Sequence, residues 1–129
     1  MPTVLVDTDV AIDFLRGVRY SKELLKSLWE RNLAYLSVLS VYELVAGLRE
    51  KERADTEHFI QAFILEAVDD PVARRGGELF RTYRKKGITL TSVDCLLMAT
   101  ALERKHKIAS RNSSHFPEKG LLLKIPSVT

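Results

Sequence analysis

Three acidic residues stand at positions in the sequence where their carboxylates could be brought together. Asp7 comes directly after the short β-branched run 3–6, which is typical of a buried strand. Glu43 and Asp94 each lie in the first turn of a predicted helix, and Asp94 follows the segment 88–91. Because sites in open parallel sheets form outside the carboxyl ends of the strands, these acids are predicted to share one edge of a sheet.

The chemistry that three such carboxylates offer is the binding of a divalent cation. Like charges held close together repel, and burial would raise their pKa values unless a cation lay between them. Oxygen ligands suit Mg²⁺ or Mn²⁺ rather than Zn²⁺, which favours His and Cys. A bound ion of this kind activates a water and stabilises the charge of a phosphodiester during cleavage. The acids therefore predict a metal-dependent nuclease, which needs no nucleophile–base pair among Ser, Cys and His.

Helix capping is the competing explanation for each acid taken singly. An acid in the first turn is favoured by the helix dipole whether or not it binds anything. Ser40-x-x-Glu43 has the pattern of a capping box, and Thr91-x-x-Asp94 nearly has it. Asp7, directly after a strand, could equally cap the next helix. One acid alone therefore says little, and the concurrence of three is what favours a site.

Strands and helices alternate along the chain. We expect strands at 3–6, 33–36, 65–68, 107–110 and 121–125, and helices at 8–17, 21–31, 40–48, 54–64, 71–86 and 93–105. The first helix would be capped by Asp7 or Thr8 and stopped by Gly17, and the last helix would be capped by Thr91 or Ser92. Such alternation with short connections predicts an α/β fold, with a central, mostly parallel sheet and helices on both faces.

Length and composition fit one ordinary globular domain. The chain has 129 residues, of which 46% are hydrophobic and 29% charged, so we expect a single domain over residues 1–129. The net charge of +3 is compatible with nucleic acid as a partner without requiring it. The sequence has no apolar run near the roughly 20 residues of a membrane span, and no export signal is recognised at the N-terminus. A single cysteine, Cys95, gives no internal disulfide, so a cytoplasmic location is expected.

Four blocks of the sequence resemble, in order, the four sequence blocks of PIN-domain proteins. The first block is 7–17, which opens with Asp7-Thr-Asp, and the second is 36–47, which contains Glu43. The third is 93–102, in which an acid heads an Ala-rich apolar helix, and the fourth is 110–116. The subgroup that the chain resembles most is the VapC-type toxin of type II toxin–antitoxin systems.

That resemblance implies a fold and an activity. The fold would be PIN-like, and the activity would be that of a Mg²⁺-dependent endoribonuclease, with Mn²⁺ as a substitute ion. Asp7, Glu43 and Asp94 occupy the positions of catalytic metal ligands in the family. The family is usually homodimeric, and its toxins are held inactive by an antitoxin on a separate chain. RNA rather than DNA as the substrate also comes from the resemblance.

The fourth block departs from the family pattern. Asn112 stands where many members have a fourth acid; its amide oxygen could hold a water or metal but brings no negative charge, which weakens the case for a tightly bound second ion. Ser110 stands where Thr is frequent and could still orient an acid through its hydroxyl. Arg111, beside Asn112, would lie at the rim of the site, which makes it a candidate contact for RNA phosphate.

Five other residues invite an interpretation. Asp9 could point toward the site, whereas Asp13 is expected on a solvated helix face. His115 precedes a Phe near the end of a strand and is expected to close a loop rather than to act as a base. His106 lies in a charged stretch and is expected at the surface, and Cys95 lies within an apolar helix and is expected in the core.

Three other functions stay open from the sequence. Asp7-Thr-Asp9 matches the start of haloacid dehalogenase-type phosphotransferases, although Ala11 replaces the hydroxyl or β-branched residue expected there. A phospho-accepting receiver domain has similar length and binds Mg²⁺, but Glu43 and Asp94 do not supply its arrangement of acids. A catalytically silent PIN-like scaffold would bind RNA or protein without cutting; the presence of all three acids argues against it.

Overall fold

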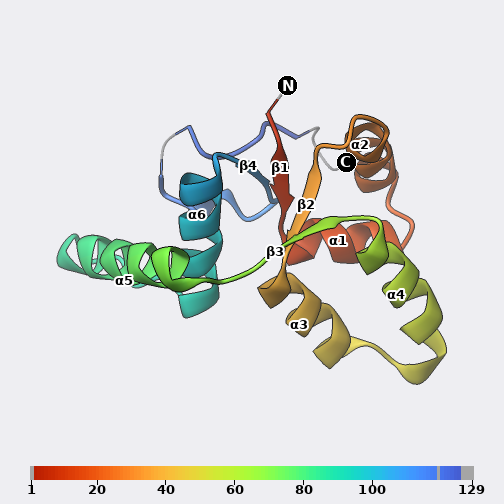
Figure 1. Ribbon diagram of the computed structural model, residues 1–129, viewed down its shortest axis with the longest axis horizontal. Coiled ribbons are helices and arrows are strands. Elements are labelled where there is room, and N and C mark those ends of the chain that lie inside the picture. Colours follow the sequence, from red (N-terminus) through yellow and green to blue (C-terminus); the bar gives the residue numbers. More distant parts are fainter. Residues whose placement is uncertain (1, 119, 126–129) are drawn as a thin grey trace.

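A computed structural model describes residues 2–118 and 120–125, and its centre is a four-stranded parallel sheet (Figure 1). The strand order is β3-β2-β1-β4, and each neighbouring pair is parallel. The strands are β1 (Val4–Val6), β2 (Ala34–Ser37), β3 (Ile64–Glu66) and β4 (Lys107–Ala109). The predicted parallel α/β fold is therefore confirmed.

Six α-helices and two short 3₁₀ helices connect these strands in the described part of the chain. The α-helices are α1 (Thr8–Leu15), α2 (Arg19–Glu30), α3 (Val38–Gly47), α4 (Arg53–Gln61), α5 (Asp70–Lys85) and α6 (Ser92–Arg104). The 3₁₀ helices are η1 (Glu50–Glu52) and η2 (Ser113–His115). None of the described helices is long and apolar enough to cross a bilayer.

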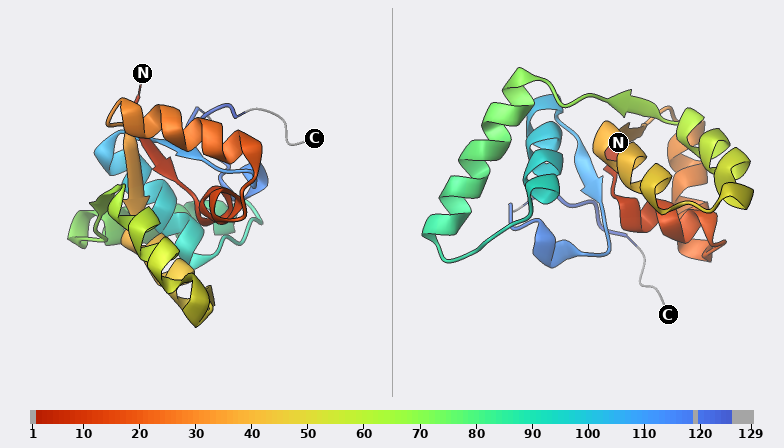
Figure 2. Two further views of the ribbon diagram at one scale, coloured as in Figure 1. Left: turned by 90° about the vertical axis from the view of Figure 1, so that its right-hand side faces the viewer. Right: turned by 90° about the horizontal axis from the view of Figure 1, so that it is seen from below.

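The sheet separates two hydrophobic cores. Val4 and Val6 of β1 point into a core shared with α1, α2, α3 and α4, whereas Leu5 points into a second core with α5 and α6. This is the alternation expected of a strand buried on both faces. Figure 2 shows the two groups of helices on opposite sides of the sheet. The backbones of α5 and α6 approach closely at Gly76, where a Cβ would lie 2.9 Å from Leu96 Cδ2.

One predicted strand is absent from the described residues, and the segment before Asp94 is a loop. The segment 88–91 forms part of the loop between α5 and α6, with Leu90 buried, and makes no strand pairing. The segment 121–125 makes only an isolated parallel bridge, between Leu122 and Ile108. Hydrogen bonds on either side of that bridge involve Ile108 alone, so the ladder does not extend into a strand.

The start of α3 also differs from the prediction. Ser37, at the end of β2, is the N-cap, and its Oγ accepts a hydrogen bond from the backbone N–H of Leu39 at 3.0 Å. Ser40 therefore lies inside the helix and is fully buried. The predicted capping box of Ser40 and Glu43 is wrong, because the chain leaves β2 directly into the helix. Glu43 therefore does not take part in capping α3.

Candidate active site

Asp7 lies where β1 ends, beside the end of β4. Its backbone N–H donates to the carbonyl of Ala109 at 2.9 Å, which continues the pairing of the two strands by one residue. Its carboxylate is the N-cap of α1: Oδ1 accepts from the N–H of Thr8 at 2.8 Å. The second oxygen, Oδ2, accepts from the hydroxyl of Ser110 at 2.8 Å. Asp7 is therefore both a helix cap and a fixed, buried acid, with 8% of its surface exposed.

The environment of Asp7 makes its negative charge costly. The pKa of Asp7 is raised from the ordinary 3.8 to about 6; burial is the largest cause, and the negative charges of Asp9 and Asp94 act in the same direction. The hydrogen bonds from Ser110 and from the N–H of Thr8 act in the opposite direction. Two acids from different helices therefore act on Asp7 electrostatically, in the direction that a bound cation would oppose.

Glu43 is connected to this site through Thr8, the residue next to Asp7. The Thr8 hydroxyl donates to Glu43 Oε1 at 2.6 Å, and its Oγ1 lies 3.0 Å from the hydroxyl oxygen of buried Ser40. This contact joins the first turn of α1 to the middle of α3. Thr8 was expected only as a candidate cap of the first helix, because a hydroxyl after a strand carries no signal beyond helix capping.

Asp94 lies in the first turn of α6 without serving as its cap. Thr91 is the N-cap, as predicted, and its Oγ1 accepts from the N–H of Asp94 at 3.1 Å. The Asp94 carboxylate, 14% exposed, faces His115 of η2, with 3.4 Å between Oδ2 and Nδ1. The expectation for His115 was only that it closes a loop; nothing in the sequence indicated that η2 would bring it to Asp94.

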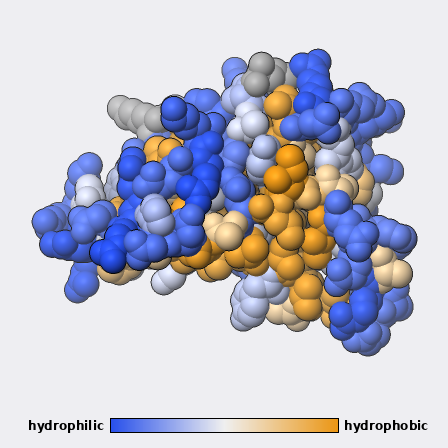
Figure 3. Space-filling view, viewed as in Figure 1, coloured by the Kyte–Doolittle hydropathy of each residue, from blue (hydrophilic) through white to orange (hydrophobic). Residues whose placement is uncertain are grey.

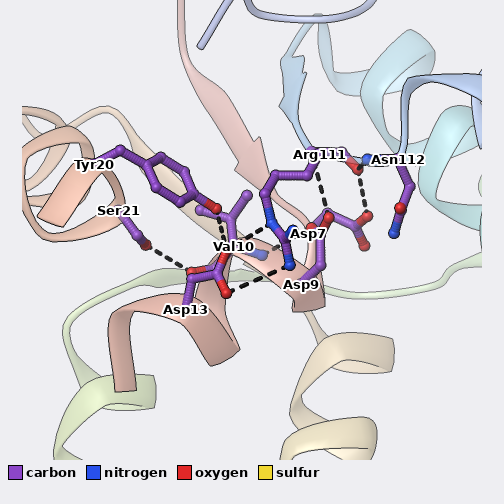
Figure 4. Close-up of polar contacts among 9 residues, drawn as sticks. Asp7, Asp9, Val10, Asp13, Tyr20, Ser21, Arg111 and Asn112 are labelled. Atoms are coloured by element: carbon purple, nitrogen blue, oxygen red, sulfur yellow. Dashed lines mark hydrogen bonds and ion pairs between the residues drawn. The ribbon is translucent and has the colours of Figure 1, made fainter. Parts of the chain in front are cut away.

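The segment 110–112, between β4 and η2, lies over the start of α1. The Ser110 hydroxyl oxygen accepts from the N–H of Asn112 at 2.9 Å while its proton goes to Asp7. Asn112 itself is exposed. The guanidinium of Arg111 turns back onto α1 and pairs with Asp13, with 2.6 Å from Nε to Oδ2 (Figure 4).

Two expectations about surface residues are wrong. Asp13 is buried, with 7% of its surface exposed, because it accepts hydrogen bonds from Tyr20 and Arg111. His106 is also buried, between Thr3 Oγ1 at 2.6 Å and Glu66 Oε2 at 2.5 Å. In both cases partners distant in sequence satisfy a polar group that looks solvated in the sequence. Cys95 is buried, as predicted.

The three predicted ligands share one region without forming a complete cluster. Within residues 2–118 and 120–125, no group of three or more His, Cys, Asp or Glu side chains is placed to hold a metal ion. Thr8 holds Glu43, and Asp94 faces His115. The available donors near Asp7 are nevertheless carboxylate and hydroxyl oxygens, which is the donor chemistry of Mg²⁺ or Mn²⁺. The raised pKa of Asp7 is what a cation would reverse.

Glu43 also lines a pocket on the side of the site formed by α1, α3, η1 and α4. Its volume is about 250 Å³. The lining residues are Ile12, Leu15, Arg16, Glu43, Leu44, Gly47, Leu48, Glu52, Asp55 and Thr56. The pocket therefore joins the acidic site to a mixed apolar and charged surface.

The exposed face of α3 is apolar. Tyr42 is 69% exposed, and Val38 and Val45 are 39% and 38% exposed. Figure 3 shows apolar surface in the middle of the view, over the positions of β3 and α3 in Figure 1, with hydrophilic surface on both sides. Helices that are apolar on most sides are normally buried, so this surface is suited to a partner.

Comparisons with known proteins agree with this geometry. The sequence matches the family described as PIN domain over residues 4–120. Ribonuclease VapC19 of Mycobacterium tuberculosis is 38% identical over 114 residues, which are 88% of this chain and 91% of the relative. Ribonuclease VapC10 of the same species is 34% identical over 114 residues, 88% of this chain and 86% of the relative. Among solved structures, a toxin–antitoxin complex from Klebsiella pneumoniae contains a chain of similar fold, with a TM-score of 0.78 and 21% identity over 94% of this chain and 96% of that one.

Proposed function

The chain belongs to the PIN-domain family, and from that premise we propose that it is a metal-dependent endoribonuclease and the toxin of a toxin–antitoxin pair. The observation that carries the proposal is the raised pKa of Asp7, about 6, in a buried acid whose pKa the negative charge of Asp94 helps to raise. A protein keeps such a group in place at a stability cost, and a cation-binding site explains why. The names of the relatives VapC19 and VapC10 support ribonuclease activity.

Asp7, Glu43 and Asp94 would hold the ion, which we propose to be Mg²⁺, with Mn²⁺ as a substitute. When bound, the ion would acidify a water molecule and neutralise charge on the phosphodiester. The chain's own residues orient the acids: Ser110 fixes one oxygen of Asp7, and Thr8 fixes one oxygen of Glu43. Binding would require Glu43 and Asp94 to turn from their present contacts.

Asn112 and Arg111 complete the proposed site at its exposed rim, between β4 and η2. Asn112 is exposed beside Ser110, where its amide could hold a water or a substrate oxygen. The side chain of Arg111 is 43% exposed, so a contact with RNA phosphate would have to compete with its ion pair to Asp13. The absence of a fourth acid at 112 favours one ion over two.

The proposed partner is an antitoxin that covers the apolar face of α3 and the pocket at Glu43. Exposed Tyr42, Val45 and Val38 offer apolar contact area, and Glu43 offers a carboxylate that an arginine of the partner could reach. The similarly folded chain from Klebsiella pneumoniae comes from a toxin–antitoxin complex.

We further propose a homodimer acting in the cytoplasm. A monomer at micromolar concentration in light scattering would count against the dimer.

The decisive experiment maps RNA ends. Purified protein is incubated with total cellular RNA and Mg²⁺, in parallel with EDTA and with Asp94→Asn. Glu103→Gln, which changes another acid on α6 far along the helix, is the matched control. Discrete cuts in the wild type and Glu103→Gln that vanish with EDTA and Asp94→Asn would support the proposal. Cuts that survive in Asp94→Asn would identify a contaminant or a different site.

A catalytically silent scaffold is the alternative that this experiment leaves if no cuts appear. Metal binding distinguishes the nuclease from the scaffold, because the proposed site predicts a rise in Tm with Mg²⁺ or Mn²⁺. That rise should be lost in Asp7→Asn. A protein that shows neither cuts nor a metal-dependent Tm would be a scaffold. Phosphotransferase and receiver functions are disfavoured by membership of the PIN-domain family.

A further inference from the structure

We propose that Asp13 and Tyr20 are positioning residues of the active site, which act through Arg111 to hold the segment 110–112 against Asp7. The expected effect on catalysis rests on the proposed nuclease function, whereas the claim that these contacts hold the segment 110–112 in place does not. Neither residue belongs to the acidic cluster, and the contacts that join them to it lie on three separate parts of the chain (Figure 4).

The first tether is an ion pair between a buried carboxylate and a partly exposed arginine, with a tyrosine hydroxyl as a hydrogen-bonded third member. Arg111 Nε lies 2.6 Å from Asp13 Oδ2, and Nη2 donates to Asp13 Oδ1 at 3.4 Å, so both carboxylate oxygens meet the guanidinium. The hydroxyl of Tyr20, in the first turn of α2, donates to the same Oδ2. Asp13 and Tyr20 are each 7% exposed. Burial and the neighbouring Asp13 raise the pKa of Tyr20, so it remains a donor at neutral pH.

The second tether fixes the backbone of the same residue. The N–H of Arg111 donates to Asp9 Oδ2 at 2.9 Å, and the other oxygen of Asp9 accepts from the N–H of Val10 at 2.7 Å. Asp9 and Asp13 are four residues apart on α1, so they lie on one face of the helix. Arg111 is thus held to that face by its backbone and by its side chain.

The residue before Arg111 is the one that touches the predicted metal ligand. Ser110 donates to Asp7 Oδ2 at 2.8 Å and accepts from the N–H of Asn112 at 2.9 Å. The segment 110–112 lies between the end of β4 and the start of η2, so regular secondary structure does not hold it. Holding Arg111 on α1 therefore fixes the residues on both sides of it, including the hydroxyl that orients Asp7.

The direction of the Arg111 side chain favours this role over a contact with RNA phosphate. In Figure 4 the guanidinium points back to Asp13, whereas Asn112 points to the opposite side. Asp13 neutralises the charge that a phosphate would need. The two roles predict opposite behaviour when Asp13 loses its charge, because an RNA-binding Arg111 would then be freed to bind.

The test uses Asp13→Asn and the milder Tyr20→Phe, which keeps the ion pair and removes one hydroxyl. The first readout is amide hydrogen exchange in the metal-free protein, which needs no activity. The expected result in Asp13→Asn is faster exchange at Arg111 and Asn112, on the order of tenfold or more, with the amides of β1 unchanged. Tyr20→Phe should show a smaller change at the same amides. Unchanged exchange at 111 and 112 in both variants would overturn the proposal whether or not the wild type cuts RNA.

The second readout is the split between kcat and KM for RNA cleavage. Asp13→Asn should lower kcat on the order of tenfold to a hundredfold with KM nearly unchanged, because a displaced acid slows the reaction without weakening RNA binding. Arg111→Lys, which keeps one charged contact, should recover part of the loss seen in Arg111→Gln. Asp70→Asn, which breaks an exposed ion pair with Arg74 on α5, is the matched control and should change neither constant. An unchanged kcat with a lower KM in Asp13→Asn would instead assign Arg111 to RNA binding and overturn the positioning role.

Discussion

The two sides of the acidic site are built in different ways. On the side of β1 and β4, each oxygen of Asp7 has a hydrogen-bond donor, and Ser110 and Arg111 are held in turn by their own contacts. On the side of α3, Glu43 meets the hydroxyl of Thr8 but faces a pocket of about 250 Å³. Beyond that pocket the exposed surface is apolar and includes Tyr42.

The difference indicates which part of the site the chain organises alone. Hydrogen bonds that connect three segments preorganise the Asp7 side, and preorganised groups need no rearrangement when charge develops. The Glu43 side is open, with apolar area of the kind that partners cover. We infer that the chain organises the first side by itself, whereas the second side, which contributes Glu43 to the proposed ion site, is where a partner controls the activity. The following variants test that division.

The largest expected effect tests whether the open side belongs to the catalytic site. Glu43→Gln keeps an oxygen that can accept from Thr8 but removes the charge proposed to bind the ion. We expect kcat/KM for RNA cleavage in Mg²⁺ to fall roughly 10²–10³-fold, the scale of losing one electrostatic stabiliser. Glu57→Gln, an exposed acid on α4, is the control. Full activity in Glu43→Gln would show that the site ends at Asp7 and Asp94.

The next effect is on the stability of the metal-free protein and concerns the preorganised side. The folded pKa of Asp7 is about 6, above its ordinary 3.8, so the folded state favours the protonated acid. The stability contributed by the proton is therefore present below about pH 4 and is lost as the pH rises through about 6. Asp7→Asn has no carboxyl to ionise at this position, so the variant should not lose this stability as the pH rises.

Asp7→Asn should therefore be more stable than the wild type at pH 7.5 in EDTA and nearly equal to it at pH 4. The gain would be at most about 3 kcal/mol, since each pH unit between the folded and unfolded pKa is worth about 1.4 kcal/mol. Urea denaturation at the two pH values measures it. With Mn²⁺ at pH 7.5 the order should reverse, because only the wild type has the charge to bind the ion. A variant less stable than the wild type at pH 7.5 in EDTA would contradict the raised pKa.

A smaller effect is expected on the open side, in partner binding. Tyr42→Ala should weaken the complex with the antitoxin by about 2 kcal/mol, or about 30-fold, as truncation of an aromatic anchor does. The urea midpoint of the free protein should not move, because Tyr42 is 69% exposed. Ile88→Ala, which truncates another exposed apolar residue in the loop after α5, is the control. Equal affinities of Tyr42→Ala and the wild type in calorimetry would place the partner elsewhere.

The sequence predicted the parts of this comparison that follow from local pattern. β-branched and apolar runs gave β1, β2 and β4, and the position of Asp7 after β1 gave its place at the sheet edge. Thr91, one of the two predicted candidates, is the cap of α6, and its hydroxyl precedes a helical apolar pattern. These features depend on neighbours within a turn or a strand, so one segment of sequence is enough to indicate them.

The features that escaped prediction depend on partners far apart in the chain. Asp13 looks like a solvated acid because its partner Arg111 comes from beyond β4. Two serines, Ser37 and Ser40, could each have capped α3, and the end of β2 decides for the first. The segment 88–91 alternates like a strand, yet it buries Leu90 within a loop and finds no strand to pair with in the described sheet. Local pattern fixes none of these outcomes.

The smallest expected effect concerns His115, which the fold brings to Asp94 with 3.4 Å between Nδ1 and Oδ2. The side chain of His115 is 52% exposed, and exposed ion pairs contribute little. His115→Ala should therefore lower kcat/KM by no more than about fivefold, because exposed pairs are worth about 1 kcal/mol or less. His58→Ala on α4 is the control. A loss as large as that of Glu43→Gln would instead mean that His115 handles a proton in the reaction, and the organised side of the site would then extend from Asp7 through Asp94 to η2.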